Sequence, residues 1–198
     1  MAVALGLGVL AFARTQTSLN GGTMRPTVAA AASCAAGVEV NNGGVFDADG
    51  FDFTFGFLRG DGGVYSNGTV TVTGEVAPSN GTFTVENLVL ADGATLKCPV
   101  TGDATDGWSA PYLTVAGSVA KVGNAILDLG HDADNPLAKG CRVKVAELAE
   151  GVESFPSMRG TGTGLKSASV VLVRKAGEGG VTEIWAEVVP SPFMLIFR

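Results

Sequence analysis

Apolar residues in this chain recur mainly with a period of two, which is the spacing of a β-strand with one buried face. In "FDFTFGF" the side chains of Phe51, Phe53, Phe55 and Phe57 alternate with those of Asp52, Thr54 and Gly56. This alternation predicts that the four rings point into the interior, with Asp52 and Thr54 outside. Shorter alternations occur in "TVTVT", "TFTVE" and "YLTVAG", and only "VAELAEGV" (145–152) has a helix-like spacing. The pattern predicts an all-β fold.

Turn signals separate these runs at intervals of about 10 to 13 residues. They are Asn20-Gly21-Gly22, Asn42-Gly43-Gly44, Asp49-Gly50, Asn67-Gly68, Asn80-Gly81 and Asp92-Gly93. Asn-Gly and Asp-Gly pairs adopt positive φ at little cost, so each allows an abrupt change of direction. Short, evenly spaced strands of this kind fit a sandwich, a barrel or a β-solenoid.

Internal similarity favours the solenoid. "SNGTVTVTGEV" (66–76) returns as "SNGTFTVENLVL" (79–90), and "APYLTVAGSV" (110–119) continues the theme. The unit is roughly 20 to 30 residues long, which lies in the range of solenoid repeats. We therefore expect a β-solenoid in which each coil buries its inward residues against its neighbours.

The C-terminal region has a different pattern. "SASVVLVRK" and "VTEIWAEVV" are both rich in β-formers, and "AGEGG" between them has hairpin length. From Ser167 to Arg198 we expect an antiparallel cap over the last coil, in which Val171, Val173, Ile184, Trp185, Phe193 and Phe197 supply apolar surface. The predicted organisation is 1–16 as the remnant of a preceding coil or a signal-like segment, 17–150 as solenoid repeats and 151–198 as the C-terminal β cap.

The order of the motifs resembles the autotransporter-associated β-strand repeats of bacterial surface proteins. The chain shows "LNGGT" at Leu19–Thr23, "GGVFD" at Gly43–Asp47, "LRGDGG" at Leu58–Gly63 and "TVTG" at Thr71–Gly74. The resemblance covers about residues 17–130 and implies a right-handed parallel β-helix, the passenger of such proteins, displayed outside the cell. The last ~70 residues are too few for a translocator barrel of twelve strands with about ten residues each. Export of this chain by the family's usual route is therefore not expected. Because the sequence begins inside a repetitive region, we expect it to be part of a longer polypeptide.

Composition excludes some functions and leaves others open. The net charge of −6 and the scattered basic residues lack the footprint of nucleic-acid binding. No stretch approaches the ~18 apolar residues of a membrane span. Cys34, Cys98 and Cys141 have no zinc-like spacing, and we interpret them as small buried residues, although pairing of Cys98 with Cys141 stays open.

Two acidic clusters are candidates for metal binding. Asp47, Asp49 and Asp52 supply oxygens suited to calcium, but Gly50 does not fit the EF-hand spacing. On a regular strand Asp47 and Asp49 share a face that excludes Asp52, and a solvated corner is the favoured interpretation. The second cluster, "HDADNP", holds His131, Asp132 and Asp134, and its composition is typical of a loop. No cofactor is expected.

Two short motifs suggest surface roles. Arg59-Gly60-Asp61 matches an integrin-binding triplet, although the repeat pattern places a glycine corner there in any case. Asn67-Gly68-Thr69 and Asn80-Gly81-Thr82 match the glycosylation sequon, and we interpret both as corners.

The sequence thus predicts a non-catalytic structural or display scaffold of a bacterial surface or secreted protein, with adhesive contacts to glycans or cell surfaces as an added role. Nucleophilic catalysis by serine or cysteine needs a base beside the nucleophile, and His131 is the single histidine. Nothing in the sequence places a serine or cysteine next to it. A polysaccharide-binding or polysaccharide-cleaving β-helix is the alternative, because two carboxylates suffice for glycoside hydrolysis.

Overall fold

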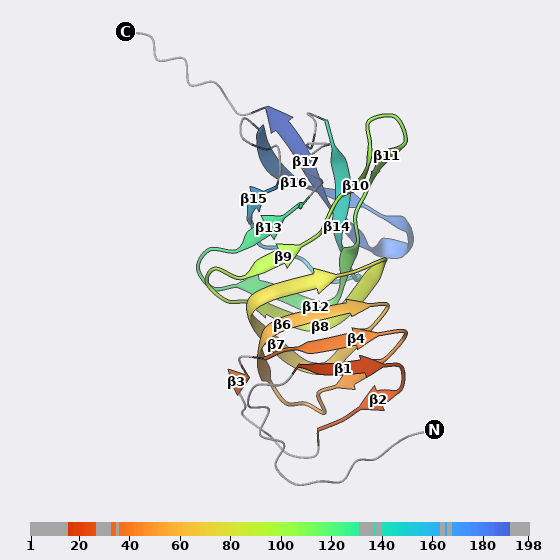
Figure 1. The fold of residues 1–198 in the computed structure, drawn as a ribbon, viewed down its shortest axis with the longest axis vertical. Coiled ribbons are helices and arrows are strands. Elements are labelled where there is room, and N and C mark those ends of the chain that lie inside the picture. Colours follow the sequence, from red (N-terminus) through yellow and green to blue (C-terminus); the bar gives the residue numbers. More distant parts are fainter. Residues whose placement is uncertain are drawn as a thin grey trace.

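The computed structural model describes residues 16–26, 33–34, 36–130, 137, 140–162, 165 and 168–190. These residues form a mostly β protein with one 15-stranded, largely parallel mixed sheet and a separate two-stranded sheet (Figure 1). Their only helix is a short 3-10 turn, η1 (Glu178–Gly180). The all-β prediction is confirmed at this level.

The strands are named in chain order. They are β1 (Thr17–Asn20), β2 (Thr23–Met24), β3 (Ser33–Cys34), β4 (Val38–Asn41), β5 (Val45–Asp47), β6 (Phe53–Asp61), β7 (Val64–Pro78), β8 (Thr82–Leu90), β9 (Thr95–Lys97), β10 (Thr101–Asp103), β11 (Gly107–Ser109), β12 (Tyr112–Lys121), β13 (Ile126–Asp128), β14 (Arg142–Leu148), β15 (Arg159–Thr161), β16 (Ala168–Ala176) and β17 (Thr182–Pro190).

Parallel pairing divides the sheet into three ladders. Ladder A joins β1, β4, the ends of β6 and β7, β9, β13 and β15. Ladder B joins β2, β5, the starts of β7, β8 and β12, and β14. Ladder C joins β3, the start of β6, the middle of β7 and the ends of β8 and β12. The long strands β6, β7, β8 and β12 therefore each serve two or three ladders.

The sequence distance between successive partners in a ladder lengthens along the chain. Leu58 pairs with Val38 on one side and Val76 on the other, a separation of roughly 20 residues. Leu127 pairs with Leu96 and Gly160, roughly 30 residues away in each direction. The first of these longer intervals contains the antiparallel β10–β11 hairpin, which projects from the stack of strands (Figure 1).

Inward side chains from the ladders form one continuous core. Toward the N-terminal end of this core Phe46 stacks on Tyr65, with centroids 5.3 Å apart, and meets Phe53 and Phe55 edge-on at 5.4 and 5.9 Å. The prediction for Phe53 and Phe55 is correct, since they are 2% and 1% exposed. The prediction for Phe57 is wrong.

A register shift between the pairs of Phe55 and Phe57 explains the error. The irregularity changes the phase of the alternation, so Leu58 becomes the buried residue and Phe57 lies half-exposed. Its ring carries the Arg59 guanidinium at 4.4 Å from the centroid. Phe51 is half-buried and packs against the core, while Asp52 is exposed.

The predicted corners are present. Within the described ranges, four non-glycine residues have positive φ, namely Asn42 (53°), Asp49 (53°), Asn67 (56°) and Asn80 (51°). Short Asn and Asp side chains tolerate this left-handed conformation better than other L-residues. The Asn-Gly and Asp-Gly signals therefore mark real changes of direction.

The predicted C-terminal antiparallel pair is confirmed over Ala168–Pro190. Strands β16 and β17 pair antiparallel, with Ala168 opposite Pro190 at one end and Ala176 opposite Thr182 at the other. Strand β17 also pairs antiparallel with β14. Ile184, Ala186 and Val188 of β17 enter the core. Val171 was predicted to add apolar cover but is 45% exposed, because it lies on the outer face of the outermost strand β16. Phe193 and Phe197 lie outside the described residues.

The helix-like spacing of residues 145–152 does not produce a helix. Residues up to Leu148 belong to β14, where Val143, Val145 and Leu148 are buried. Beyond this segment the chain still contains a parallel strand, β15, which pairs with β13.

Candidate functional site

Asp47, the last residue of β5, is the only buried charged side chain among the described residues, with 4% exposure. Its Oδ1 accepts hydrogen bonds from Asn67 Nδ2 at 2.9 Å and from the Asp49 backbone N–H at 3.0 Å. Its Oδ2 accepts a bond from Arg25 Nε at 2.8 Å and a second from Arg25 Nη2. The predicted solvated corner is therefore wrong for Asp47, since a buried carboxylate persists only where donors replace water.

The surroundings of Asp47 hold it in its ionised form. The Asn67 hydrogen bond lowers the pKa of this carboxyl most, and the Arg25 guanidinium and the Asp49 N–H lower it further, against a raising effect of burial. Through these bonds Asp47 holds the chain in place at Arg25, shortly after β2.

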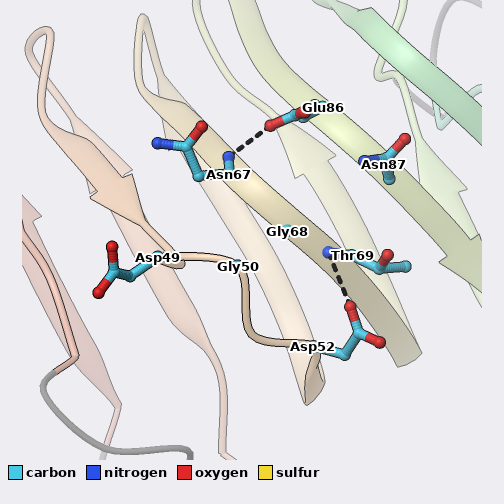
Figure 2. Close-up of a pocket in the computed structure, with 8 residues that line it drawn as sticks. All are labelled: Asp49, Gly50, Asp52, Asn67, Gly68, Thr69, Glu86 and Asn87. Atoms are coloured by element: carbon cyan, nitrogen blue, oxygen red, sulfur yellow. Dashed lines mark hydrogen bonds between the residues drawn. The ribbon is translucent and has the colours of Figure 1, made fainter.

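An open, shallow depression lies beside this corner. It is lined by Asp49, Gly50, Asp52, Asn67, Gly68, Thr69, Glu86 and Asn87 (Figure 2). The Thr69 backbone N–H donates to Asp52 Oδ1 at 3.2 Å, and the Asn67 N–H donates to the Glu86 carboxylate. The polar groups that line the depression thus already form hydrogen bonds with one another between neighbouring strands.

The residues of the first candidate metal cluster do not lie on the faces that strand alternation predicts. Positive φ at Asp49 breaks the strand alternation, so Asp47 turns inward while Asp49 and Asp52 both reach the depression. No group of three or more His, Cys, Asp or Glu side chains within the described ranges is arranged to hold a metal ion. His131, Asp132 and Asp134 lie outside those ranges.

The Arg-Gly-Asp triplet lies within strand β6. Arg59 Nε bonds Glu75 Oε1 at 2.9 Å, and the Asp61 N–H donates to Asn41 Oδ1 at 3.0 Å. Gly60 is buried, and a Cβ there would lie 2.1 Å from the Val40 carbonyl oxygen. The triplet is thus extended and engaged in the sheet.

Cys98 and Cys141 are buried and are not joined in a disulfide. Burial, followed by the charge of Asp128, raises the pKa of the Cys98 thiol far above neutrality, and burial raises that of Cys141 to about 11. Both thiols are therefore protonated at neutral pH and unsuited to nucleophilic attack. The interpretation as small core residues is confirmed for these two. Nothing is described of the Cys34 side chain.

A strip of aromatic and charged side chains, the aromatic strip, was not found from the sequence. Lys144 Nζ lies 4.0 Å from the Tyr112 ring centroid and bonds Glu147 at 2.9 Å and Glu183 at 3.4 Å. Trp185 Nε1 donates to Glu183 at 2.9 Å. Lys175 lies 4.1 Å from the Trp185 ring centroid. The strip joins β12, β14, β17 and β16. Alternation places these residues outward, but only the strand pairing brings them together.

Comparison of the chain with protein-family models, curated proteins and solved structures finds no match. Within the described part of the chain, no helix combines the length and apolar character needed to cross a bilayer. Any functional argument therefore rests on the residues themselves.

Proposed function

We propose that this chain is a right-handed parallel β-helix that serves as a non-catalytic structural and display scaffold of a bacterial surface or secreted protein. The observation that carries the proposal is the order in which the chain visits the ladders. It passes from ladder C to A to B and back to C, from β3 through β4 and β5 into β6, and repeats this order as far as β14. A right-handed turn is the usual hand for parallel crossovers.

The dimensions fit a stiff rod. Ladder A contains seven strands, and a spacing of about 4.8 Å between neighbours gives it a length of roughly 29 Å. Each added unit lengthens such a stack by the same step, which suits a spacer or stalk.

The side chains described below stabilise contacts between neighbouring strands. Apolar residues fill the interior, and polar corner groups such as Asp47 and Asn67 bond one another. On the outer face of ladder A, Glu75 of β7 pairs with Arg59 of β6 and Lys97 of β9. The antiparallel strands after β15 cover apolar surface at the end of the stack, which otherwise exposes strand edges prone to association.

The proposed location rests on the resemblance of the motif order to autotransporter-associated repeats. In this proposal the chain spaces other parts of a larger surface protein.

Two assays on the full chain separate this proposal from its alternatives. On a glycan array, and in a reducing-end assay with plant and mucin polysaccharides, we expect signals no higher than those of heat-denatured protein. Glycan binding would favour an adhesin, and Trp185→Ala would show whether the aromatic strip carries it. Release of reducing ends by the native chain would contradict the scaffold and favour an enzyme.

A further inference from the structure

Strand β16 is the outermost strand at one end of the 15-stranded sheet, and its outer edge has no strand partner among the described residues (Figure 1). At the hairpin turn the Gly177 N–H donates to the Val181 carbonyl at 3.0 Å. Hydrogen-bonded positions alternate along an antiparallel pair, so this bond fixes which residues of β16 face β17 and which face outward. The backbone N–H and C=O groups that point to the outer edge belong to Ala168, Val170, Leu172, Arg174 and Ala176.

This edge lacks most of the features that protect edge strands. Native sheets blunt their edges with short strands, prolines, bulges or charged side chains. Strand β16 has nine residues without a proline, and its pairing with β17 has no register shift. By contrast, β1 at the other end of the sheet has four residues. The charged residues of β16, Arg174 and Lys175, lie together near its end, and Val171 in the uncharged part is 45% exposed.

The sequence of β16 is complementary to a second copy of itself in antiparallel orientation. A two-fold axis at Leu172 aligns all nine residues, and it places outward-facing backbone groups opposite one another. Each Arg174 then lies opposite Val170 of the other copy. In a parallel pair in the same register, Arg174 and Lys175 would each lie opposite their own counterpart, and like charges in that position are destabilising. Charge therefore favours the antiparallel arrangement.

A strand formed by the residues after Pro190 is the competing occupant of this edge. Pro190 lies opposite Ala168, so a strand that continues from there along the edge of β16 runs parallel to it. Parallel neighbours require a long crossover connection, whereas a second copy pairs without any connection. The second copy is therefore the better fit.

We propose that β16 joins two copies of this chain into a two-fold symmetric dimer with one sheet continuous across the axis. Val171 of each copy then lies opposite Val173 of the other on the outer face, which covers the exposed Val171 side chain. The contact uses the same edge in both copies, so it closes at two chains. It concerns the antiparallel cap alone and does not depend on the proposed scaffold function.

Sedimentation equilibrium of the full chain over a range of concentrations tests the dimer. We expect a reversible equilibrium between monomer and dimer without larger species. Val171→Lys brings like charges together across the axis and close to Lys175, so it should weaken association by more than about tenfold while the far-UV circular dichroism stays unchanged. Val122→Lys is the matched control, because Val122 is 61% exposed and lies outside β16, and it should leave association unchanged.

A double variant, Val171→Cys with Val173→Cys, tests the register. Cα atoms of a non-hydrogen-bonded antiparallel pair lie about 4.5 Å apart, which is within the range of a disulfide. Mild oxidation should therefore give a covalent dimer in which mass spectrometry finds position 171 linked to position 173 of the other copy. Val122→Cys should stay monomeric on a denaturing, non-reducing gel.

Three results would overturn the proposal. A wild-type chain that stays monomeric at every concentration would show that the edge is covered within one chain. A dimer that Val171→Lys does not weaken, or that the cysteine pair does not link, would place the contact elsewhere. Larger assemblies through β16 would contradict the two-fold closure. None of these results bears on the scaffold proposal, which the glycan and polysaccharide assays test separately.

Discussion

Replacement of Phe46 by alanine tests the packing of the aromatic cluster in the core. The ring is fully buried and contacts Phe53, Phe55 and Tyr65. A buried Phe→Ala change costs about 3–5 kcal/mol, and aromatic pairs add about 0.5–1.5 kcal/mol each beyond burial. The neighbouring rings lie on strands paired in the ladders, so the cavity cannot collapse easily. We therefore expect a loss of about 5 kcal/mol from the free energy of unfolding.

Urea denaturation followed by circular dichroism and tryptophan fluorescence measures this loss. At about 2–4 °C per kcal/mol for a chain of this size, Tm should fall by roughly 10–20 °C. Phe57→Ala is the matched control, because this outward ring gives up mainly its contact with Arg59, worth about 0.5–1 kcal/mol. A Phe46→Ala cost below about 1.5 kcal/mol, or equal costs for the two variants, would refute the assignment of inward and outward rings.

Three further predictions concern the Asp47 corner, the close approach of β4 and β6 at Gly60, and the buried thiol of Cys98. The folded-state pKa of Asp47 is lowered, so its stabilising effect is present above the unfolded pKa of about 3.9 and disappears as the pH falls through the folded value. The stability gap between wild type and Asp47→Asn in urea should therefore shrink as the pH falls from 7 to 2, and a constant gap would contradict this. Gly60→Ala should cost about 3 kcal/mol, because its Cβ meets the Val40 carbonyl at 2.1 Å, whereas a Cβ at Gly81 lies 3.8 Å from Asp61 Oδ1, an ordinary contact, and Gly81→Ala should change the unfolding midpoint little. Cys98 should resist a thiol reagent until the chain unfolds, and rapid labelling of Cys98 in native protein, read by mass spectrometry, would show that its burial is wrong.

Local rules account for the parts of the fold that depend on neighbouring residues. Period-two alternation correctly placed Phe53 and Phe55 inside, and Asn-Gly and Asp-Gly pairs marked corners, because both signals act within a few residues. The hairpin of β16 and β17 was predictable for the same reason, since its turn is short and its strands are adjacent in sequence.

Features that depend on partners far along the chain were missed. The register shift after Phe55 turned Phe57 outward, and no local sequence pattern predicts this shift. The burial of Asp47 requires Arg25 and Asn67, which lie roughly 20 residues away in either direction. The aromatic strip likewise exists only because β12, β14, β17 and β16 are neighbours.

The most direct test of the account is the pattern of interstrand nuclear Overhauser effects in the isotopically labelled full chain. The proposed β-helix predicts a connected series along ladder A, from Val38 to Leu58, Val76, Leu96 and Leu127, with the cross-peaks typical of parallel strands. Antiparallel cross-peaks between β6 and β7, as in a meander of hairpins, would contradict the β-helix and the scaffold function built on it.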